Sequence, residues 1–478
     1  MFHTLLGRLF LAWAVAIELL IVCVLPANAQ SVGNESIEQL YKEGDAALIQ
    51  GDYESAITVW NTVMQQQPNN ASAYSNLGVT LYYKRDFAGA IKNFTEAIRL
   101  QPKVGSIYFD RGIAYAHQKN YDLAIGDFTE AIQLNALTDL SYTFRGLVYA
   151  EKHDYIKEMD DLNAAIRYNP KCSEAYFYRG NIYQLNKDYK RAIEDYSKVI
   201  ELKPIFPMAY VARGAAYYME KNYDKAFEDF NEAVQQNSKL NIAYLSRSCV
   251  YLVRKDYDNA IHDLDEAIRL NPKSEIAYYK RGYAYGVKKD YEKAIENLSD
   301  VIRLNPKFIG AYYLRAFSYN RSGKYDLAIQ DCSEMIRLNP KSAQAYIERS
   351  AAYEKSGDYE KALQDSNRVI ALAPQSFYGP NDVAWIYATS PKAELRDGSK
   401  AVELARKACE LSKWKNGSTI DTLAAACAEA GKFNDAVKYQ QLAIVLKKAA
   451  NENVQAMDAR GVLYRQHQPY RDKPSAHS

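Results

Sequence analysis

The 478-residue chain has few of the residues that cross-link a fold or bind metal. It contains six cysteines, of which Cys23 lies in an apolar N-terminal segment. An odd remainder without short spacings is neither a disulfide framework nor a metal site, although Cys409 and Cys427 fall on successive predicted helices and could pair. The histidines also lack metal-ligand spacing. We therefore expect no metal and no cofactor. The residues concerned are Cys172, Cys249, Cys332, Cys409, Cys427, His117, His153, His262, His467 and His477.

The chain also lacks an excess of charge of either sign. Lysine and arginine together number 60 and aspartate and glutamate 58, which gives a formal net charge of +2. Nucleic acids and anionic lipid surfaces attract proteins through a strongly basic field. A near-neutral balance provides no such field, so we expect no nucleic-acid partner.

Catalytic signatures are missing as well. The dipeptides Gly323-Lys324 and Gly431-Lys432 lack the rest of a phosphate-binding loop, and Tyr325 and Phe433 stand where that loop has a hydroxyl residue. There is no nucleophile elbow, no pair of metal-binding histidines on a helix and no dinucleotide fingerprint. The repeats described next also leave no segment for a catalytic domain. We therefore predict that the protein is not an enzyme.

What the sequence does contain is a period of 34 residues, carried most clearly by its tyrosines. A small residue follows the recurring tyrosine four places later, and an alanine and a loop proline recur at the same period. A fixed period between about 20 and 50 residues indicates a stacked-repeat architecture. The recurring tyrosines are Tyr74, Tyr108, Tyr142, Tyr176, Tyr210, Tyr244, Tyr278, Tyr312 and Tyr346, and the alanines are Ala56, Ala90, Ala124, Ala192, Ala226, Ala260, Ala294, Ala328 and Ala362.

This order of positions resembles the tetratricopeptide repeat, over ten repeats that span residues 37–376. The resemblance implies an all-α fold, a right-handed superhelical solenoid of helix-turn-helix repeats. In the second repeat the resemblance predicts two helices, over residues 72–83 and 87–100, and Pro102 ends the second of them. Small residues let the two helices cross closely, and neighbouring aromatic residues fill the core. Because one repeat cannot bury its apolar face alone, we expect one continuous solenoid.

The N-terminus does not follow the period. Arg8, the apolar stretch 9–25 and the small residues of 26–29 predict a secretory signal peptide over residues 1–29, followed by a polar lead-in over 30–36. Glu18 interrupts the apolar stretch and argues against a permanent span. We therefore expect a periplasmic or secreted protein of the bacterial exported type. The alternative is an uncleaved anchor in the inner membrane formed by residues 9–25.

The C-terminus departs from the period in a different way. Residues 377–451 are predicted to form two degenerate repeats, which contain Ala384 and Ala436, with an insertion that begins at Thr389 and precedes Ala401. This pattern resembles the terminal repeat pair of many bacterial repeat proteins, and residues 452–478 resemble the cap and tail that follow it. Such atypical repeats cover the apolar end of a stack.

The fourth repeat has an unusual residue at a helix contact. Glu158 replaces the close-packed alanine, and Ala136 replaces the preceding loop proline. A carboxylate at this contact must be paired or must push the helices apart. We therefore predict weaker protection from hydrogen exchange over residues 140–170.

Eight arginines and eight acid or amide residues share the 34-residue period. A basic spine that faces phosphates is one interpretation, and an internal ladder, in which each arginine holds a carboxylate of the second helix, is the other. A planar guanidinium binds a carboxylate through two hydrogen bonds, so we favour the ladder. The residues are Arg111, Arg145, Arg179, Arg213, Arg247, Arg281, Arg315 and Arg349 with Asp127, Asp161, Asp195, Asp229, Asp263, Asn297, Asp331 and Asp365.

The family resemblance implies a concave groove along the first helices of the repeats. Residues one and five places after the recurring tyrosine would face this groove, and aromatic residues form two groups there. These side chains either line an apolar groove for an extended segment or an amphipathic helix, or pack on one another across a tight superhelix. The candidate groove residues are Phe109, Ile113, Phe177, Asn181, Leu245, Tyr279, Tyr283, Tyr313 and Phe317.

The sequence therefore predicts an exported, non-catalytic scaffold that binds protein or peptide segments in the groove. Where some family members grip a C-terminal carboxylate, this chain has Asp45 and Asp110, which would repel that ligand. The alternative function is a structural subunit of a cell-envelope assembly or export machine, such as a polysaccharide, pilus or outer-membrane system. Such a subunit would contact its partners through the edges of the solenoid.

Overall fold

The structure is a computed structural model that describes residues 35–472. Within these residues it contains α-helices and one 3-10 helix, η2, and no strand, which confirms the predicted all-α fold. None of the described helices is long and apolar enough to cross a membrane. The predicted signal peptide at 1–29, the alternative anchor at 9–25 and the end of the tail lie outside the described residues.

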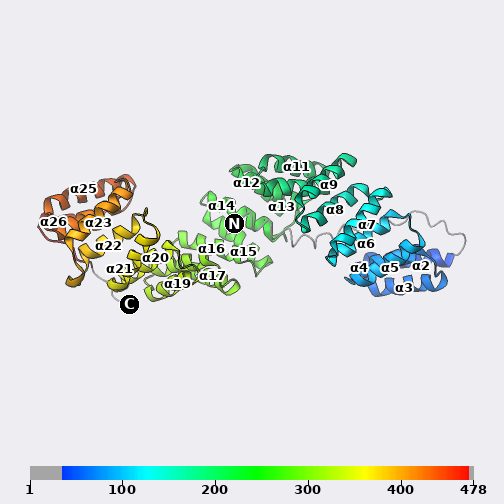
Figure 1. Cartoon of the computed structure of the whole chain (residues 1–478), viewed down its shortest axis with the longest axis horizontal. Coiled ribbons are helices and arrows are strands. Elements are labelled where there is room, and N and C mark those ends of the chain that lie inside the picture. The colour runs from blue at the N-terminus through cyan, green and yellow to red at the C-terminus, as the bar shows by residue number, and fades with distance from the viewer. Residues whose placement is uncertain (1–34, 473–478) are drawn as a thin grey trace. The chain divides into compact units, whose positions relative to one another are not determined.

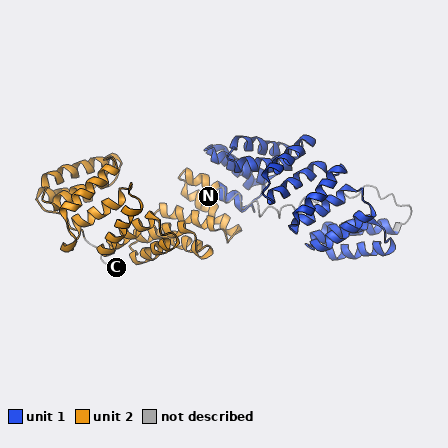
Figure 2. Ribbon diagram, in the orientation of Figure 1, with its two compact units in different colours: residues 1–246 blue, residues 247–478 orange. Residues whose placement is uncertain are grey.

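The chain divides into two compact units, residues 1–246 and 247–478 (Figure 2), and the boundary falls inside helix α14 (Asn241–Val253). The sequence predicted one continuous solenoid. A division of this kind is consistent with a repeat protein, because each repeat packs on its neighbours and no single core gathers distant repeats. We therefore treat each unit by itself.

The helices of both units follow one another as antiparallel neighbours (Figure 1). Before α14, the chain forms α2 (Glu35–Gln50), α3 (Tyr53–Gln66), α4 (Ala71–Tyr83), α5 (Phe87–Leu100), α6 (Gly105–His117), α7 (Tyr121–Gln133), α8 (Thr138–Glu151), α9 (Tyr155–Tyr168), α10 (Ser173–Leu185), α11 (Tyr189–Leu202), α12 (Pro207–Met219) and α13 (Tyr223–Gln236). After α14 it forms α15 (Tyr257–Leu270), α16 (Glu275–Val287), α17 (Tyr291–Leu304), α18 (Ile309–Arg321), α19 (Tyr325–Leu338), α20 (Ala343–Ser356), α21 (Tyr359–Leu372), α22 (Tyr378–Thr389), η2 (Ala393–Leu395), α23 (Gly398–Leu411), α24 (Gly417–Glu429), α25 (Phe433–Ala449) and α26 (Gln455–Arg465).

A short turn with a fixed chemistry joins the two helices of most repeats. In the second repeat, Arg85 takes a positive φ of 66°, and the Asp86 carboxylate then accepts a hydrogen bond from the Gly89 amide at 2.9 Å. The positive φ reverses the chain, and the aspartate caps the new helix by satisfying an amide that has no partner within the helix. The helices predicted over 72–83 and 87–100 are observed as α4 and α5.

The recurring glycines lie where the first helix crosses an aromatic ring of the second. A Cβ atom on Gly78 would stand 2.6 Å from the ring of Phe94, and one on Gly214 would stand 2.8 Å from the ring of Phe230. Both distances are too short for two carbon atoms in contact, so any larger residue would push the helices apart. The recurring alanines, such as Ala90, are fully buried at the same contact. The predicted role of the small residues is confirmed.

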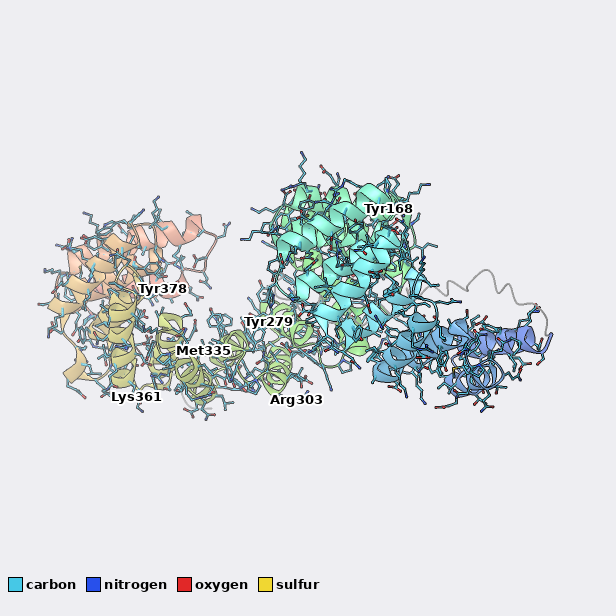
Figure 3. All side chains as sticks on the ribbon, turned by 45° about the vertical axis from the view of Figure 1, so that its right-hand side comes forward. Tyr168, Tyr279, Arg303, Met335, Lys361 and Tyr378 are labelled. Carbon is cyan, nitrogen blue, oxygen red and sulfur yellow. The ribbon has the colours of Figure 1, made fainter. Side chains whose placement is uncertain are left out.

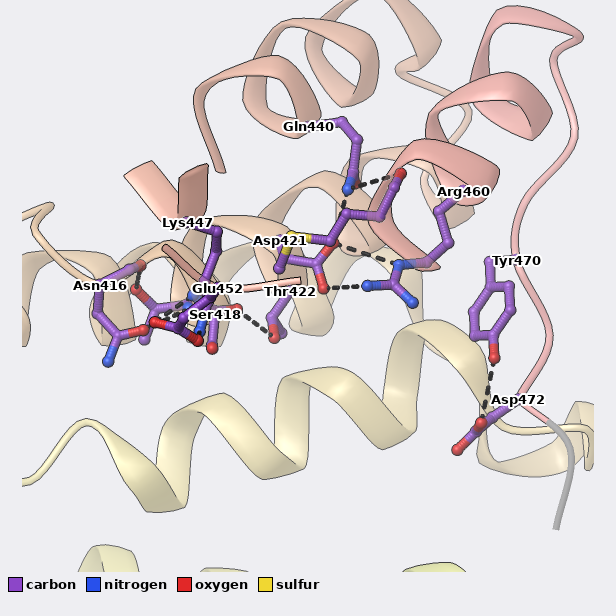
Figure 4. A network of polar contacts seen from close by, with 12 residues as sticks. Asn416, Ser418, Asp421, Thr422, Gln440, Lys447, Glu452, Arg460, Tyr470 and Asp472 are labelled. Carbon is purple, nitrogen blue, oxygen red and sulfur yellow. Dashed lines mark hydrogen bonds and ion pairs between the residues drawn. The ribbon is translucent and has the colours of Figure 1, made fainter. Parts of the chain in front are cut away.

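The C-terminal helices close on one another through a polar network (Figure 4). Arg460 of α26 lies 2.6 Å from the buried Asp421 of α24, and Gln440 of α25 donates to the same carboxylate at 2.8 Å. The guanidinium of Arg460 also lies 5.4 Å from the ring centroids of both Trp385 and Tyr470. These contacts join α24, α25, α26 and the segment that follows α26 to α22.

The cysteines of the described part are all free and buried. Cys409 and Cys427, which the sequence allowed to pair, are therefore not bonded in this structure. Burial raises the pKa of each of these two thiols to about 11, so the reactive thiolate is scarce at neutral pH.

Candidate protein-binding surface

The recurring arginines are engaged inside the repeats. Arg213 of α12 donates to Asp229 of α13 through Nε at 2.9 Å and through Nη2 at 2.8 Å. Its Nη1 donates at 3.1 Å to Ser197 on α11, the second helix of the preceding repeat. The two-pronged contact repeats as Arg111–Asp127, Arg145–Asp161, Arg179–Asp195, Arg247–Asp263, Arg315–Asp331 and Arg349–Asp365. The predicted ladder is confirmed.

Arg281 is the exception in this ladder. Its Nε donates to the amide oxygen of Asn297 at 2.7 Å, while its Nη1 pairs with Asp265 on the preceding second helix. The side chain of Asp265 is 51% exposed, so this ion pair is screened by water more than the others are. The ladder thus continues through the seventh and eighth repeats with one weaker rung.

Four of the candidate groove residues are buried in the repeat cores. Phe109 packs 5.7 Å from Phe128 and 5.4 Å from Phe144, in the same apolar cluster as Ile113. Phe177 packs 5.4 Å from Phe206 in a separate cluster. Leu245 is buried as well. These four side chains therefore pack in the core, which is the second of the two alternatives that the sequence left open. In this structure they form no open surface.

Asn181 has a structural contact rather than an open position. Its amide oxygen lies 2.7 Å from the hydroxyl of Tyr196, which also lies 2.9 Å from Gln184. Tyr196 is fully buried, and a buried hydroxyl needs such a partner. Asn181 therefore satisfies the hydroxyl of a core tyrosine.

The remaining four candidates gather in the second unit. The ring centroids of Tyr279 and Phe308 lie 5.0 Å apart, and the Arg321 guanidinium lies 5.1 Å from the ring centroid of Phe317. Tyr283 is 43% exposed. Burial raises the pKa of Tyr279, and the phenols of Tyr283 and Tyr313 raise it further. Tyr279 and Tyr283 lie on α16 and Tyr313 lies on α18, and these two first helices contact each other.

One further aromatic residue extends this group onto α22. Burial raises the pKa of Tyr313, and Glu348 and Tyr378 are the next causes. Tyr378 is 47% exposed and stacks on Phe377 at 4.4 Å. In Figure 3, Tyr279 and Tyr378 lie along one edge of the unit, and Arg303 and Lys361 from second helices lie along the opposite edge. We call the set Tyr279, Tyr283, Tyr313, Phe317 and Tyr378 the tyrosine face.

Carboxylates accompany the tyrosine face on α20 and α22. Burial raises the pKa of Asp382 to about 7, followed by the repulsion from Glu354, and Glu348 contributes as well. Burial also raises the pKa values of Glu348 and Glu354. Gln344 donates to Glu348 at 2.9 Å, and Asn381 donates to Asp382 at 3.2 Å. This end of the face is therefore acidic, and its three carboxylates are partly buried.

Sequence reasoning missed Tyr378, Glu348 and Asp382. A signal was present, because Glu348 and Asp382 stand 34 residues apart and two places after the recurring tyrosine position. The groove candidates stand one and five places after that tyrosine, and the position two places after it was considered only in the first repeats, at Asp110. No group of histidine, cysteine, aspartate or glutamate in the described part is arranged to hold a metal ion, and this acidic end is no exception.

The fold and this surface define an all-α repeat protein with a partly exposed aromatic side. Family models described as tetratricopeptide repeat or TPR repeat match residues 44–84, 76–137, 173–206, 207–240, 249–286, 276–308 and 313–377. These ranges together cover more than half of the chain, which therefore belongs to the tetratricopeptide repeat family. No curated protein matches the chain.

The chain also matches solved structures, each at a TM-score below 0.5. The Cut9–Hcn1 hetero-tetramer of APC/C matches at 14% identity and a TM-score of 0.45, over 91% of this chain and 96% of that one. Yeast Tom70 matches at 16% identity and a TM-score of 0.37, over 90% and 96% of the two chains. YrrB, described as a TPR protein with an unusual peptide-binding site, matches at 20% identity and a TM-score of 0.37, over 39% and 96%.

Proposed function

We propose that the protein is a non-catalytic scaffold that binds a segment of a partner protein on the tyrosine face. The main support for this proposal is a contrast in burial between aromatic side chains of the first helices. Phe109 and Phe177 are buried, whereas Tyr283 is 43% exposed and Tyr378 is 47% exposed. Clustered aromatic side chains that stay partly exposed are typical of protein-binding surfaces. Tyrosine suits such a surface because it offers a large rigid ring together with a hydroxyl group.

Site-specific photocrosslinking in living cells tests this proposal. A photoreactive phenylalanine analogue at position 283 or 378 should crosslink the full-length protein to a partner protein. The same analogue at position 155 serves as the control, because Tyr155 is 59% exposed on a second helix. Equal crosslinking from position 155, or none from 283 and 378, would contradict binding on the tyrosine face.

A second candidate function uses the outer side of the repeats. On α9 in the first unit, Tyr155 is 59%, Ile156 77% and Tyr168 57% exposed. Exposed apolar residues on a second helix favour the role of a structural subunit in a cell-envelope assembly. Crosslinks from position 155 alone would favour this function, and Tyr155→Ser with Ile156→Ser should then prevent the assembly.

We also propose that the protein acts outside the cytoplasm, in the periplasm or after secretion. The charged start, the apolar stretch 9–25 and the small residues before Gln30 support cleavage after Ala29. N-terminal sequencing of the protein purified from cells tests this. An intact N-terminus together with recovery in the membrane fraction would instead support an anchor formed by residues 9–25.

A further inference from the structure

Several second helices of the repeats carry the same ion pair on their exposed side. In α17, the guanidinium of Arg303 lies 2.7 Å from the carboxylate of Asp300, three residues earlier, and both side chains reach water. The same pair recurs as Glu96–Arg99 on α5, Glu266–Arg269 on α15 and Glu334–Arg337 on α19. Side chains three residues apart are neighbours on a helix, so these pairs keep one strip of each helix charged and hydrated.

Helix α25 has apolar residues in place of this pair. Counted from the aromatic residue that opens each second helix, Leu442 and Val445 stand where α17 has Asp300 and Arg303. Leu442 is 42% exposed and Val445 is 62% exposed. Two neighbouring apolar side chains thus replace two charges at a place that water reaches. Apolar residues that cluster on a surface, unlike isolated ones, indicate contact with another molecule or with a membrane.

Trp414 extends this apolar strip beyond the helix. It lies in the turn before α24 and is 36% exposed, and its ring centroid lies 6.1 Å from that of Tyr439 on α25. Tyr439 stands three residues before Leu442, so its ring borders the strip. The turn continues along α25, because a Cβ atom on Gly417 would stand 2.9 Å from Cγ of Lys447.

The backbone of this turn is unusual. Lys413 and Trp414 both have a positive φ, of 53° and 58°. Bulky residues rarely adopt this left-handed region, and two in succession cost more than the single one found before α17 at Lys289. The Trp414 amide donates to the Cys409 carbonyl oxygen at 2.7 Å, which fixes the turn at the end of α23. The turn thus holds a tryptophan at the surface in a strained conformation, and such strain is concentrated at functional sites.

Exposed lysines border the apolar residues on both sides. Lys413 and Lys415 flank Trp414 in the chain, while Lys438 lies one turn before Leu442 and Lys448 one turn after Val445. All four lysines are exposed, and within residues 35–472 none of them forms an ion pair. Their charges are therefore available to another molecule. We call Trp414, Tyr439, Leu442 and Val445 with these four lysines the basic apolar patch.

Acidic residues are sparse around the basic apolar patch. The exposed acids nearest in the chain are Glu410, before the turn, and Asp435, at the start of α25. No acid occurs between Asp435 and Glu452, and Glu452 lies 2.6 Å from the ammonium of Lys447. The patch is therefore positively charged, although the whole chain has a formal net charge of only +2.

This combination matches the surface of a lipid bilayer. Tryptophan and tyrosine favour the interfacial region, where one part of the ring is apolar and another is wet. Leucine and valine favour the boundary of the acyl chains, and lysine ammonium groups reach the phosphates of anionic headgroups. An acidic protein would complement the lysines, but it would not account for the apolar strip between them.

We propose that the basic apolar patch rests on a membrane surface that carries anionic phospholipids. The patch lies on the surface and does not span the bilayer. The inference goes beyond the proposed function, because it concerns where the protein is held rather than what the tyrosine face binds. It also holds whether or not residues 1–29 are removed.

Quenching of tryptophan fluorescence by vesicles tests this inference at the patch itself. The vesicles contain phosphatidylcholine with brominated acyl chains, either alone or with about one-third phosphatidylglycerol. The protein is used as it is isolated from cells, so any contribution of residues 9–25 is common to all variants. With the anionic vesicles, the wild type should lose about twice as much emission as Trp414→Phe, because Trp60 is fully buried.

A double variant that restores the ion pair of the other helices tests the apolar part. Leu442→Asp with Val445→Arg leaves the net charge unchanged and copies the pair of α17. Cosedimentation with the anionic vesicles should weaken about tenfold. A melting temperature close to that of the wild type would show that the variant is folded, and the lysine variants below test the inference independently of it.

Two lysine variants with the same charge change test the basic part. Lys413→Gln with Lys415→Gln should weaken binding to the anionic vesicles about tenfold. Lys273→Gln with Lys341→Gln is the matched control, because these lysines are exposed in loops of the same unit, and it should change binding less than about twofold. Raising the salt from about 0.1 M to about 1 M should release the wild type from the vesicles.

Several results would overturn the inference. They are equal quenching in the wild type and Trp414→Phe, equal binding to neutral and anionic vesicles, and an equal loss in the two lysine variants. Binding to polyglutamate without binding to anionic vesicles would also overturn it and would indicate an acidic protein as the partner. Crosslinking from position 283 is a separate measurement, so the proposed function stands or falls independently.

Discussion

The two units differ in how deeply they bury aromatic residues at the same repeat position. In the first unit, the ring of Phe109 on a first helix packs against Phe128 on the second helix, and both are buried. In the second unit, the second helices carry Leu298 and Cys332 at the position of Phe128, and Tyr279 on the first helix is only partly buried. The core of the second unit thus depends less on aromatic pairs.

The difference follows from the chemistry of the two side chains. Phenylalanine has no polar atom, so complete burial leaves nothing unsatisfied, and a second ring adds a favourable edge contact. Tyrosine carries a hydroxyl group that needs a partner when it is buried, and partial exposure lets water provide one. One repeat position can therefore hold a fully buried ring in one region and a partly exposed ring in another.

The largest effect that this comparison predicts comes from removing a core ring. Phe109→Ala should lower the free energy of unfolding by about 3–5 kcal/mol, because Phe109 is fully buried among other rings. Phe317→Ala in the second unit should cost about 1 kcal/mol or less, because its ring is partly exposed. Urea denaturation of both variants measures the difference. Similar losses would show that the two regions pack alike.

A second prediction compares two rungs of the arginine ladder. Arg213→Ala should cost about 2–4 kcal/mol and lower the melting temperature, because it leaves the Asp229 carboxylate buried without its cation. Arg281→Ala should cost less, because its buried partner Asn297 is uncharged. Thermal unfolding of the two variants tests the order. If Arg213→Ala left stability intact and abolished a binding activity, a structural role for the ladder would be wrong.

A third prediction concerns the buried carboxylate of the first unit. Glu158 is 4% exposed, and burial raises its pKa from the ordinary 4.5 to about 7. The charged form therefore destabilises the fold above pH 7, and this effect fades as the pH falls towards 4.5. Glu158→Gln should raise the free energy of unfolding by up to about 2–3 kcal/mol at pH 8 and change it little at pH 4.5.

Hydrogen exchange tests the same feature in the unmodified protein. Residues 140–170 should exchange faster at pH 8 than residues 276–306 of the second unit, where Ala294 occupies the position of Glu158. The difference in exchange rate between the two regions should be smaller in Glu158→Gln. Equally slow exchange in both regions of the wild type would show that the carboxylate does not loosen its repeat.

The smallest predicted effect on stability is that of Tyr283→Ala. With 43% of the residue exposed, its loss should change the free energy of unfolding by about 0.5 kcal/mol or less. Combined with Phe317→Ala, it should nevertheless abolish capture of the partner. A large loss of stability together with intact capture of the partner would show that Tyr283 belongs to the core and not to the binding surface.

Much of the fold could be predicted from the sequence because the repeat lattice records local contacts. Gly78 against Phe94 and Arg213 against Asp229 lie 16 residues apart in neighbouring helices, and the period repeats this geometry along the chain. The candidate surface was harder to predict. Phe109 and Tyr279 occupy the same repeat position, and the pattern alone does not tell which of them is covered.

By itself, the sequence determined the helix pairs, their turns, the small residues at the crossings and the arginine ladder, since each of these depends on residues at fixed short separations. Only the tertiary structure decided which first-helix rings are buried, as Phe109 and Phe177 are, and which stay partly exposed, as Tyr283 does. The physical reason is that exposure and hydration depend on the combined volume of side chains from several repeats.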